Sequence, residues 1–331
     1  MDFDFNDEQR EIKSTAREFL SSRFKPERVR ELAESDSPYG EEWDAICELG
    51  WPGIAISEEY GGEGLGTVEL IILQEELGYA LAPTPFIANA YAGAVIQAAG
   101  SDEQKQKWLP GIASGKERGS AELTCDPDPI LGAAGGASIL VLADGEGAKL
   151  VEPANATLEQ LDFIDTTRAY FRVKADGGDP LPGDIASAGS VGQIALAAEC
   201  VGVAQRALDM AVEYAKERQQ FGRPIGAYQA VSHRLADMLW EVEEARSLTY
   251  SAAWAADADL DLLPIAASMA KARASDAATS VTHHAIQVFG GIGFTWEHDV
   301  HFLLKRARAS AQMMGTPRAH RDNVATLVGL G

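Results

Sequence analysis

The feature that most constrains the fold of this 331-residue chain is a long apolar stripe between positions 231 and 256. Its members recur at alternating steps of four and three residues, the spacing that keeps side chains on one face of an α-helix. The stripe consists of Val231, Leu235, Met238, Val242, Ala245, Thr249, Ala252 and Ala256. A helix of this length needs an antiparallel helical neighbour to cover its stripe, so we expect a four-helix bundle. Pro264 stands where a first-turn proline would begin the next helix of that bundle.

The rest of the chain divides by its local patterns. Capping-box patterns at Asn6–Gln9 and Ser101–Gln104 predict helix starts in the first part of the chain. Short apolar runs at 138–142 and 170–174, separated by Gly and Asp turns, predict strands in the middle.

We therefore predict a mainly α fold in three parts. They are an N-terminal helical domain over residues 1–120, a reduced β domain over 121–188 and a C-terminal helical bundle over 189–331.

The charge balance restricts the partners of the chain. It has 28 Lys and Arg against 50 Asp and Glu, a formal net charge of −22 and a pI of about 4.6. A surface this acidic repels a phosphate lattice, which argues against nucleic acid, and it is also repelled by anionic membranes. We expect neither partner.

The cysteines and histidines indicate neither a disulfide framework nor a metal site. Cys47, Cys125 and Cys200 are too few for a framework and lack metal-ligand spacing. His283 and His284 are adjacent, so on a helix their side chains diverge by about 100° and make poor joint ligands. We predict no bound metal.

The sequence also predicts a cytoplasmic protein. Its acidic N-terminus is unlike a signal peptide. The longest apolar stretches, at 86–99 and 194–212, are either too short to span a membrane or broken by Glu199 and Arg206.

Two segments of the second half carry recognisable motifs. One spans Arg218 to Gln229 and reads RQQFGRPIGAYQ; the other spans Gln287 to Phe294 and reads QVFGGIGF. The first resembles the R-x-x-F-G-x-x-I-x-x-x-Q turn of the acyl-CoA dehydrogenase family, and the second resembles that family's Q-x-x-G-G-x-G-F/Y turn. Segments 50–54, 58–64 and 104–110 also look like family segments. The resemblance covers nearly the whole chain except its middle.

The resemblance implies FAD as cofactor. An arginine suits the pyrophosphate, a phenylalanine can pack on the ribityl or adenine portion, and adjacent glycines let backbone amides come close. In the family these residues reach an FAD held mainly by the neighbouring subunit. The predicted cofactor-binding residues are Arg218, Phe221, Gln229, Gln287, Gly290 and Gly291. The alternative is that the glycines only close the bundle turns and that Arg218 is a surface charge.

The family's catalytic base is absent from both of its usual positions. The base is a glutamate in an E-G-T turn after the last long helix, where this chain has Met314 before Gly315 and Thr316. A minority of the family places the base just before an arginine near the start of the bundle, where this chain has Gly192 and Gln193. Neither a thioether nor a glycine can remove a proton from carbon. We predict no catalytic residue in this chain.

The flavin-ring pocket is also reduced. The segment from Leu123 to Pro129 retains only part of the family's T-E-P-x-x-G-S-D loop, and no W-I-T segment is present. The chain therefore cannot hold both ends of a flavin by itself.

These observations favour one subunit of a heteromeric acyl-CoA dehydrogenase, an α2β2 assembly. A full-length partner would bind the acyl-CoA and supply the glutamate for α,β-dehydrogenation, and resemblance alone indicates bacterial steroid side-chain degradation as the setting. Two alternatives stay open. One is a non-catalytic structural homologue, and the other is a self-sufficient flavoenzyme with an unconventional base such as Glu199 or Glu297.

Overall fold

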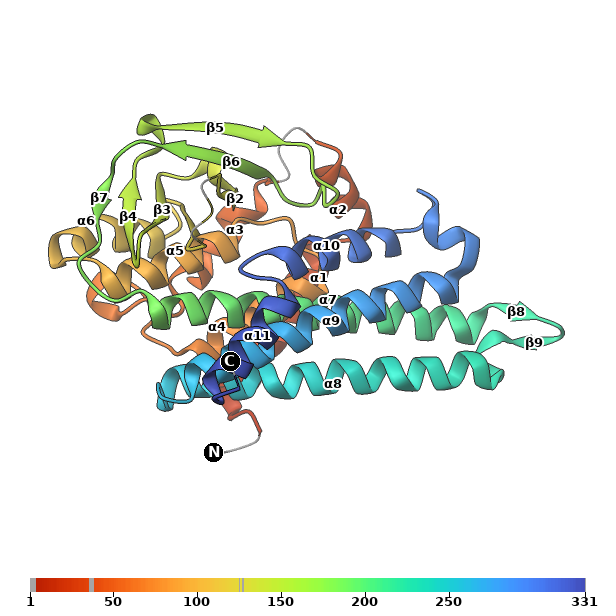
Figure 1. The fold of residues 1–331 in the computed structure, drawn as a ribbon. Helices are drawn as coiled ribbons and strands as arrows, with labels where there is room; N and C mark the ends of the chain where they lie inside the picture. Colours follow the sequence, from red (N-terminus) through yellow and green to blue (C-terminus); the bar gives the residue numbers. More distant parts are fainter. Residues whose placement is uncertain (1–3, 36–38, 125, 127, 331) are drawn as a thin grey trace.

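The computed structural model describes residues 4–35, 39–124, 126 and 128–330. Its described part is mainly helical, with helices at both ends of the chain and two small sheets between them (Figure 1). Helices α1 to α6 come first. They are α1 (Asp7–Arg23), α2 (Pro26–Ala33), α3 (Glu42–Glu48), α4 (Thr67–Tyr79), α5 (Phe86–Ala99) and α6 (Asp102–Ala113).

Both predicted capping boxes are confirmed. The Asn6 side chain accepts from the Gln9 backbone N–H at 2.8 Å, and the Gln9 side chain accepts from the Asn6 N–H at 3.1 Å. Ser101 and Gln104 form the same reciprocal pair at the start of α6. Each box satisfies amide groups that the first helical turn leaves unpaired.

The middle of the chain forms two sheets. The first is ordered β1 (Gly119–Glu122), β3 (Ile139–Asp144), β4 (Gly147–Val151) and β7 (Asp179–Pro180), with β1 parallel to β3 and the other pairs antiparallel. The second is antiparallel, ordered β2 (Ile130–Gly132), β6 (Tyr170–Ala175) and β5 (Ala156–Leu161). The strands predicted at 138–142 and 170–174 are therefore confirmed as β3 and β6.

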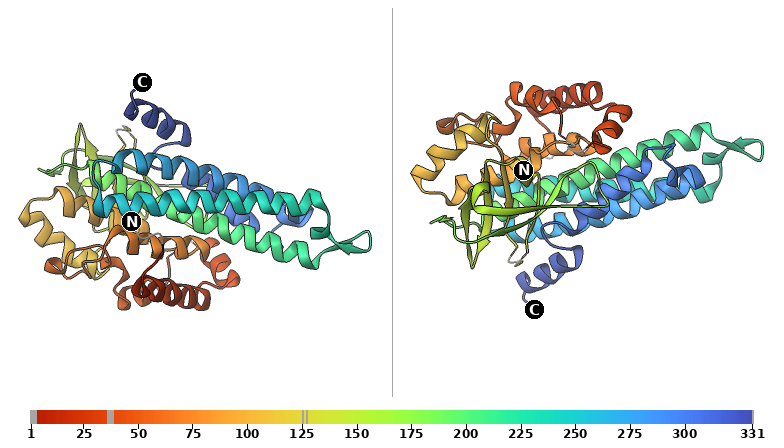
Figure 2. Two further views of the ribbon diagram at one scale, coloured as in Figure 1. Left: turned by 90° about the horizontal axis from the view of Figure 1, so that it is seen from below. Right: turned by 90° about the horizontal axis from the view of Figure 1, so that it is seen from above.

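The C-terminal helices form the bundle. They are α7 (Ala186–Glu217), α8 (Gln229–Ala258), α9 (Leu263–Phe289), α10 (Val300–Gln312) and α11 (Pro317–Leu327). The three long helices α7, α8 and α9 run side by side, and the shorter α10 packs on α7 and α9 as the fourth (Figure 2). Pro264 lies in the first turn of α9, as predicted.

The apolar stripe on α8 is confirmed. Met238, Val242, Ala245, Thr249 and Ala252 are buried, while the stripe's outer members near the two ends of the helix are half-buried. The stripe packs mainly against α9 and α7.

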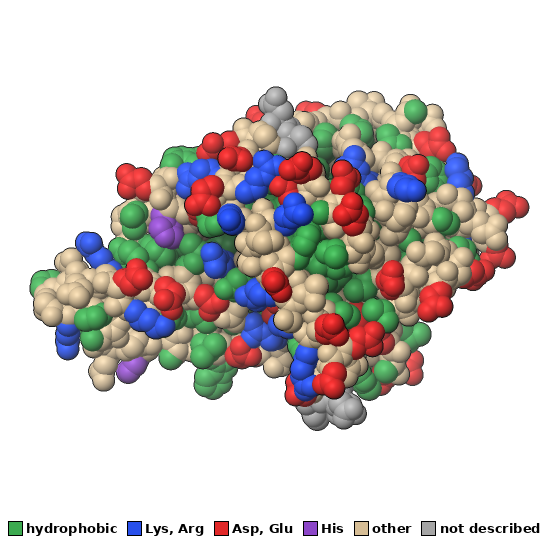
Figure 3. Space-filling model, turned by 180° about the vertical axis from the view of Figure 1, so that it is seen from behind, with side chains coloured by type: hydrophobic (Ala, Val, Ile, Leu, Met, Phe, Trp, Pro, Cys, Tyr) green, Lys and Arg blue, Asp and Glu red, His purple; other side chains and the backbone are tan. Residues whose placement is uncertain are grey.

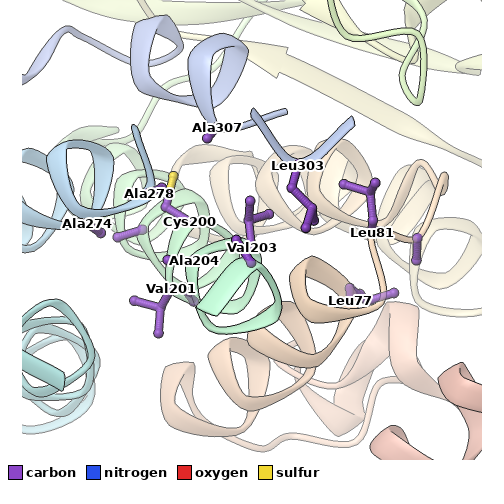
Figure 4. Close-up of a cluster of buried hydrophobic side chains, with 14 of the residues drawn as sticks. Leu77, Leu81, Cys200, Val201, Val203, Ala204, Ala274, Ala278, Leu303 and Ala307 are labelled. Carbon is purple, nitrogen blue, oxygen red and sulfur yellow. The ribbon is translucent and has the colours of Figure 1, made fainter. Parts of the chain in front are cut away.

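The N-terminal helices share a core with the bundle, because α4 packs directly on α7. Leu77 and Leu81, at and just beyond the end of α4, lie beside Val203 and Ala204 of α7, with Leu303 of α10 close by (Figure 4). Two glycines allow the close contact. A Cβ on Gly78 would stand 2.4 Å from the Glu199 carbonyl oxygen, and one on Gly202 would stand 2.0 Å from the Glu75 carbonyl oxygen.

Among the described helices, α7 alone is long and apolar enough to cross a membrane, and 72% of its most apolar window is buried inside the protein. It is the central helix of the bundle, in contact with α4, α8, α9 and α10. On the face seen from behind, acidic and basic side chains are interspersed (Figure 3).

Along the chain the structure passes from helix to strand after Ala113 and returns to helix at Ala186. The predicted division into domains at 120/121 and 188/189 stays a prediction.

Candidate cofactor-binding site

The two motif segments lie at the same end of the bundle. The first forms the connection from α7 to α8, a hairpin of β8 (Gln219–Gln220) and β9 (Arg223–Pro224), and the second forms the turn after α9 (Figure 1). The ring of Tyr214, near the end of α7, stands 4.4 Å from the ring of Phe289 at the end of α9, centroid to centroid. The fold therefore brings together two segments that are about seventy residues apart.

Arg218 and Phe221 both point into solvent from the hairpin. Arg218 directly follows α7 as its C-cap, its backbone N–H donates to the Tyr214 carbonyl at 2.9 Å, and its guanidinium has no ion pair within the described residues. Phe221 is 93% exposed at the hairpin tip, with φ at +52°, and Gly222 follows at +80°. A large apolar side chain in the left-handed region is uncommon, and among the described residues the one ring contact of Phe221 is a distant edge contact to Tyr228 at 6.4 Å. The packing of the chain itself does not explain the placement of the Phe221 ring.

The glycines of the second turn differ in whether the packing of the chain itself requires them. Gly290 has φ +66° and ψ −140°, a conformation that only glycine adopts readily. A Cβ on Gly290 or Gly291 would meet nothing within 4 Å, whereas one on Gly293 would meet the Phe289 Cβ at 3.0 Å. Gly293 is thus required by internal packing. The Gly290 N–H donates to the Ile286 carbonyl and closes α9, while the surface at Gly290 and Gly291 faces open space, where another molecule can approach the backbone.

Gln229 and Gln287 complete the set. Gln229 is the first residue of α8 and Gln287 lies in the last turn of α9; both are exposed. In the part of the chain that the structure describes, neither side chain makes a hydrogen bond.

The six predicted residues therefore share one end of the bundle and face outward. They offer one free guanidinium, one exposed ring, two amide side chains and two open glycine backbones. These groups fit a flavin dinucleotide approached from outside, because a pyrophosphate takes a guanidinium and close backbone amides.

The two positions at which we predict the family's base to be missing have apolar or aromatic neighbours. Met314 packs against the buried Ile87, Ala195 and Leu196. At the other position, a Cβ on Gly192 would stand 2.5 Å from the ring of the buried Tyr91.

The turn that carries Met314 is held in place by the buried Lys271. Its ammonium donates to the carbonyl oxygens of Ser310 and Gly315, both at 3.2 Å, and to the Ser275 hydroxyl at 3.0 Å. Burial lowers the pKa of Lys271 below its ordinary value. These contacts tie the turn at Gly315 to α10 and α9.

Glu199, one of the alternative bases, belongs to a buried polar cluster. We call this set the Glu199 cluster; it consists of Asp165, Arg168, Glu199, Arg306 and Ser310. The Glu199 carboxylate pairs with Arg168, lies 3.5 Å from Arg306 and accepts from Ser310 at 2.8 Å. It is 1% exposed, so substrate cannot reach it in this arrangement.

The Glu199 cluster joins three parts of the chain. Asp165 and Arg168 come from the loop before β6, Glu199 from α7, and Arg306 from α10. Arg306 pairs with Asp165 at 2.7 Å. Burial of Asp165 opposes its ionisation, but the Arg306 and Arg168 guanidiniums outweigh that effect and lower the pKa of Asp165. The cluster fastens the small sheets to the bundle.

Three other features considered in the sequence are Glu297, the segment from Leu123 to Pro129, and the pair His283 and His284. Glu297 is exposed in the loop before α10. Of the remnant from Leu123 to Pro129, Cys125 and Pro127 lie outside the described residues. Among the described residues, no group of three or more His, Cys, Asp and Glu side chains is placed to hold a metal ion, and the rings of His283 and His284 stand 6.0 Å apart.

The fold is that of a class of flavin-dependent dehydrogenases, as its likeness to known proteins shows. Residues 6–116 match the N-terminal domain of acyl-CoA dehydrogenases, and residues 185–328 match the C-terminal domain. The chain is 35% identical over 316 residues to the acyl-CoA dehydrogenase IpdE2 of Mycolicibacterium smegmatis, covering 94% of this chain and 96% of the relative. The IpdE2 of Mycobacterium tuberculosis is also 35% identical, over 314 residues, with 94% of both chains covered.

Solved structures agree. A variant of the Tcur3481–Tcur3483 steroid ACAD superposes with a TM-score of 0.90 at 28% identity, over 97% of both chains. The ChsE4–ChsE5 complex from Mycobacterium tuberculosis gives a TM-score of 0.92 at 24% identity over the full length of both chains. At that identity the second likeness shows the fold alone.

This chain belongs to the acyl-CoA dehydrogenase family. The family is one of flavin-dependent oxidoreductases, and its cofactor is FAD.

Proposed function

We propose that this chain is the FAD-completing subunit of a heteromeric acyl-CoA dehydrogenase and carries no catalytic base of its own. The observation that carries the proposal is a contrast within one chain. Six residues suited to FAD face outward from one end of the bundle. Met314, by contrast, stands at the position of the base and packs among Ile87, Ala195 and Leu196. A full-length partner supplies the flavin-ring pocket and the glutamate.

The division of labour follows from the residues present. FAD, when bound, accepts the hydride from the β-carbon of the acyl-CoA. Arg218 would neutralise pyrophosphate charge, the open backbone at Gly291 would come close to its oxygens, and Phe221 would exclude water beside them. The partner's glutamate removes the α-proton. This chain binds and orients the cofactor, and the partner binds the acyl-CoA and moves the proton.

The substrate class and the assembly rest on relatives. The Tcur3481–Tcur3483 enzyme is described as a steroid ACAD, and both it and ChsE4–ChsE5 pair two different chains. We propose an α2β2 enzyme acting on a steroid side-chain acyl-CoA, in the cytoplasm, as the charge and the few cysteines predict.

A self-sufficient enzyme with Glu199 as base is disfavoured by the geometry. Proton abstraction from carbon needs a carboxylate within reach of substrate, and Glu199 is buried and paired with two guanidiniums. A silent structural homologue is disfavoured by the unexplained left-handed Phe221 and the open backbone at Gly290 and Gly291.

Flavin content tests the proposal. The chain is purified alone and with the full-length dehydrogenase subunit that it retains in its own host, and the flavin absorbance is recorded for each. We expect a colourless chain and a yellow complex. A yellow chain without partner, or a colourless complex, contradicts the proposal.

Substitution of Arg218 sharpens the test. Loss of a charge-assisted contact costs about 1.5–3 kcal/mol, so Arg218→Ala should weaken FAD binding to the complex roughly tenfold to a hundredfold. Arg223→Ala is the matched control, because Arg223 lies on the same hairpin and stacks on Tyr228 at 4.0 Å. Equal flavin loss from both variants would show that Arg218 has no specific contact with FAD and that any change on this hairpin weakens FAD binding.

The missing base is tested by rate. Met314→Leu conserves side-chain volume, and we expect the dehydrogenation rate of the complex to stay within about twofold, since no proton passes through this position. Substituting the partner's glutamate should abolish turnover with FAD still bound. A loss of turnover in Met314→Leu as large as in the glutamate variant would overturn the proposed role.

A further inference from the structure

A cavity lies where the N-terminal helices meet the bundle, away from the predicted cofactor residues. It has a volume of about 160 Å³ and lies between α1, α2, the end of α4, α7 and α10, and we call it the α1–α10 cavity. Its apolar wall consists of Leu20, Phe24, Val29, Leu81, Phe302 and Leu303. Each of these six side chains is at most 6% exposed, so the wall belongs to the core of the protein and not to its outer surface.

The size of the cavity limits its ligand. An apolar cavity of about 150 Å³ has room for a molecule the size of benzene. The α1–α10 cavity therefore takes an apolar group of about six carbon atoms. An uncommon backbone conformation holds one residue of the wall: Leu81, drawn with Leu303 in Figure 4, has φ +51°, in the left-handed region that favours glycine. The chain thus keeps a large apolar side chain in this wall at the end of α4, where glycine is usual.

Three cations line the same cavity and reach solvent. They are Arg17, Lys25 and Arg206. Arg17 is engaged within the chain, because its guanidinium pairs with the buried Glu76. Within the described residues, the side chains of Lys25 and Arg206 have neither an ion pair nor a hydrogen bond. Two positive charges at the cavity are therefore available to a ligand.

The two arginines flank one aromatic ring. The guanidinium carbon of Arg17 lies 3.5 Å from the centre of the Tyr79 ring, and that of Arg206 lies 5.4 Å from it. The Tyr79 hydroxyl donates to Asp209 at 2.8 Å, which fixes the ring. Stacking on the ring orients the Arg206 side chain and leaves its N–H groups available for a carboxylate.

Each of the two carboxylates among the described lining residues is paired with a cation. Glu76 pairs with Arg17 and with Lys13, the latter at 3.2 Å. Asp299 pairs with Arg30. In a chain of net charge −22, the cavity therefore combines an apolar wall with free positive charge. A neutral apolar ligand would leave that charge unused, whereas an anionic group on an apolar body uses both features.

We propose that the α1–α10 cavity binds a small amphipathic carboxylate whose apolar chain or ring has about six carbons. The apolar part packs against the wall, the carboxylate accepts from the Arg206 guanidinium, and Lys25 adds positive charge. The bound molecule bridges α1 and α2 to α7 and α10, and it stabilises the folded chain by mass action. The inference is independent of the proposed function, because Arg206 precedes Arg218 by twelve residues, about 18 Å along α7, and Met314 packs in a different apolar cluster.

Calorimetry with short carboxylates tests the proposal. Hexanoate and phenylacetate are titrated into the full chain, alone and with the partner that it retains, and acetate and 1-hexanol are titrated separately. We expect at least one of the two amphipathic carboxylates to bind with a Kd of about 0.1–1 mM. Acetate and 1-hexanol should bind at least about tenfold more weakly, because each lacks one half of the contact. Tighter binding of hexanoate identifies a chain as the preferred apolar part, and tighter binding of phenylacetate identifies a ring.

Substitutions locate the site. Arg206→Gln keeps a polar side chain and removes the charge, so it should raise the Kd about tenfold or more, while Arg206→Lys should retain part of the affinity. Val29→Phe puts a ring into the cavity and should abolish binding to the folded protein. Lys216→Ala is the matched control. Lys216 lies on the same helix as Arg206 and pairs with Glu213 at 2.8 Å, and its loss should leave the Kd unchanged.

Three results would overturn the inference: no binding of either carboxylate to the folded chain, binding that Arg206→Gln does not weaken, or equally tight binding of 1-hexanol. Binding to the chain alone but not to the complex would mean that a partner side chain fills the cavity, which also contradicts a small-molecule site. Flavin content keeps this result distinct from the proposed function. Loss of flavin from the Arg218→Ala complex, in a protein that binds neither carboxylate, removes the cavity site and leaves the proposed function standing.

Discussion

Replacing Glu199 by glutamine should cost this protein much of its stability and none of its chemistry. The carboxylate is 1% exposed and holds Arg168 and Arg306, which are 7% and 1% exposed. Glu199→Gln keeps the shape and removes the charge, so Arg168 is left buried without a carboxylate while Arg306 keeps Asp165 at 2.7 Å.

The magnitude follows from the burial. Removing one partner of a buried ion pair costs about 3–5 kcal/mol, because the remaining charge is left uncompensated. A folded domain is stable by only about 5–15 kcal/mol, so the variant should approach the margin. The control is Glu213→Gln on the same helix. Glu213 pairs with Lys216 at 2.8 Å with both side chains 66% exposed, and such surface pairs contribute only about 0–1 kcal/mol.

Urea unfolding measures the difference. With an m value near 3 kcal/mol/M, the midpoint should fall by about 1 to 1.7 M for Glu199→Gln and by less than about 0.3 M for Glu213→Gln. The combined replacement Glu199→Leu with Arg168→Met removes both charges of one pair and should recover part of the loss. A midpoint shift for Glu199→Gln no larger than that of the control would refute the argument from burial. Loss of turnover at temperatures where the variant is still folded would instead make Glu199 catalytic.

Three further outcomes follow from the same structure. Because the folded-state pKa of Asp165 is lowered, its contribution to stability is present above the ordinary aspartate value of 3.8 and is lost as the pH falls below it. The urea midpoint of wild type should therefore exceed that of Asp165→Asn at neutral pH, and the difference should shrink as the pH falls below about 3.8; a difference that does not change with pH would contradict this. Gly202→Ala forces a methyl group to within 2.0 Å of the Glu75 carbonyl oxygen and should lower the free energy of unfolding by about 1–3 kcal/mol or more; a thermal midpoint equal to wild type would contradict the close helix contact. Gly291→Ala meets nothing within 4 Å, so its thermal midpoint should match wild type while the flavin content of the complex drops; an unchanged flavin content would remove this glycine from the cofactor site.

Local sequence patterns are sufficient to predict the helices and their ends, but they are insufficient to predict the contacts between helices. The stripe on α8, the capping boxes at Asn6 and Ser101 and the proline that begins α9 depend on residues within a few turns, so the sequence predicts them correctly. The Glu199 cluster could not be predicted in this way, because Arg168 and Arg306 come from elements 31 and 107 residues away from Glu199. From the sequence, Glu199 appears only as an interruption of an apolar run or as an alternative base.

The candidate site shows the same limit. Its residue types come from motifs, but their outward direction depends on how α7 and α9 pack, through contacts such as that of Tyr214 with Phe289.

The contact between α4 and α7 has a consequence for folding during synthesis on the ribosome. Of the thirteen residues of α4, ten are buried, chiefly by a helix that begins more than one hundred residues later in the chain. At about 5–20 residues per second, the ribosome delivers α7 roughly 5 to 30 seconds after α4 has been made. During that interval Leu70, Ile71, Leu73 and Leu77 lack α7, and α1 is the one main helical neighbour of α4, among the described helices, that has already been made. The period after α4 has been made and before α7 has been made is therefore the stage of synthesis at which this protein is most exposed to aggregation and to capture by chaperones.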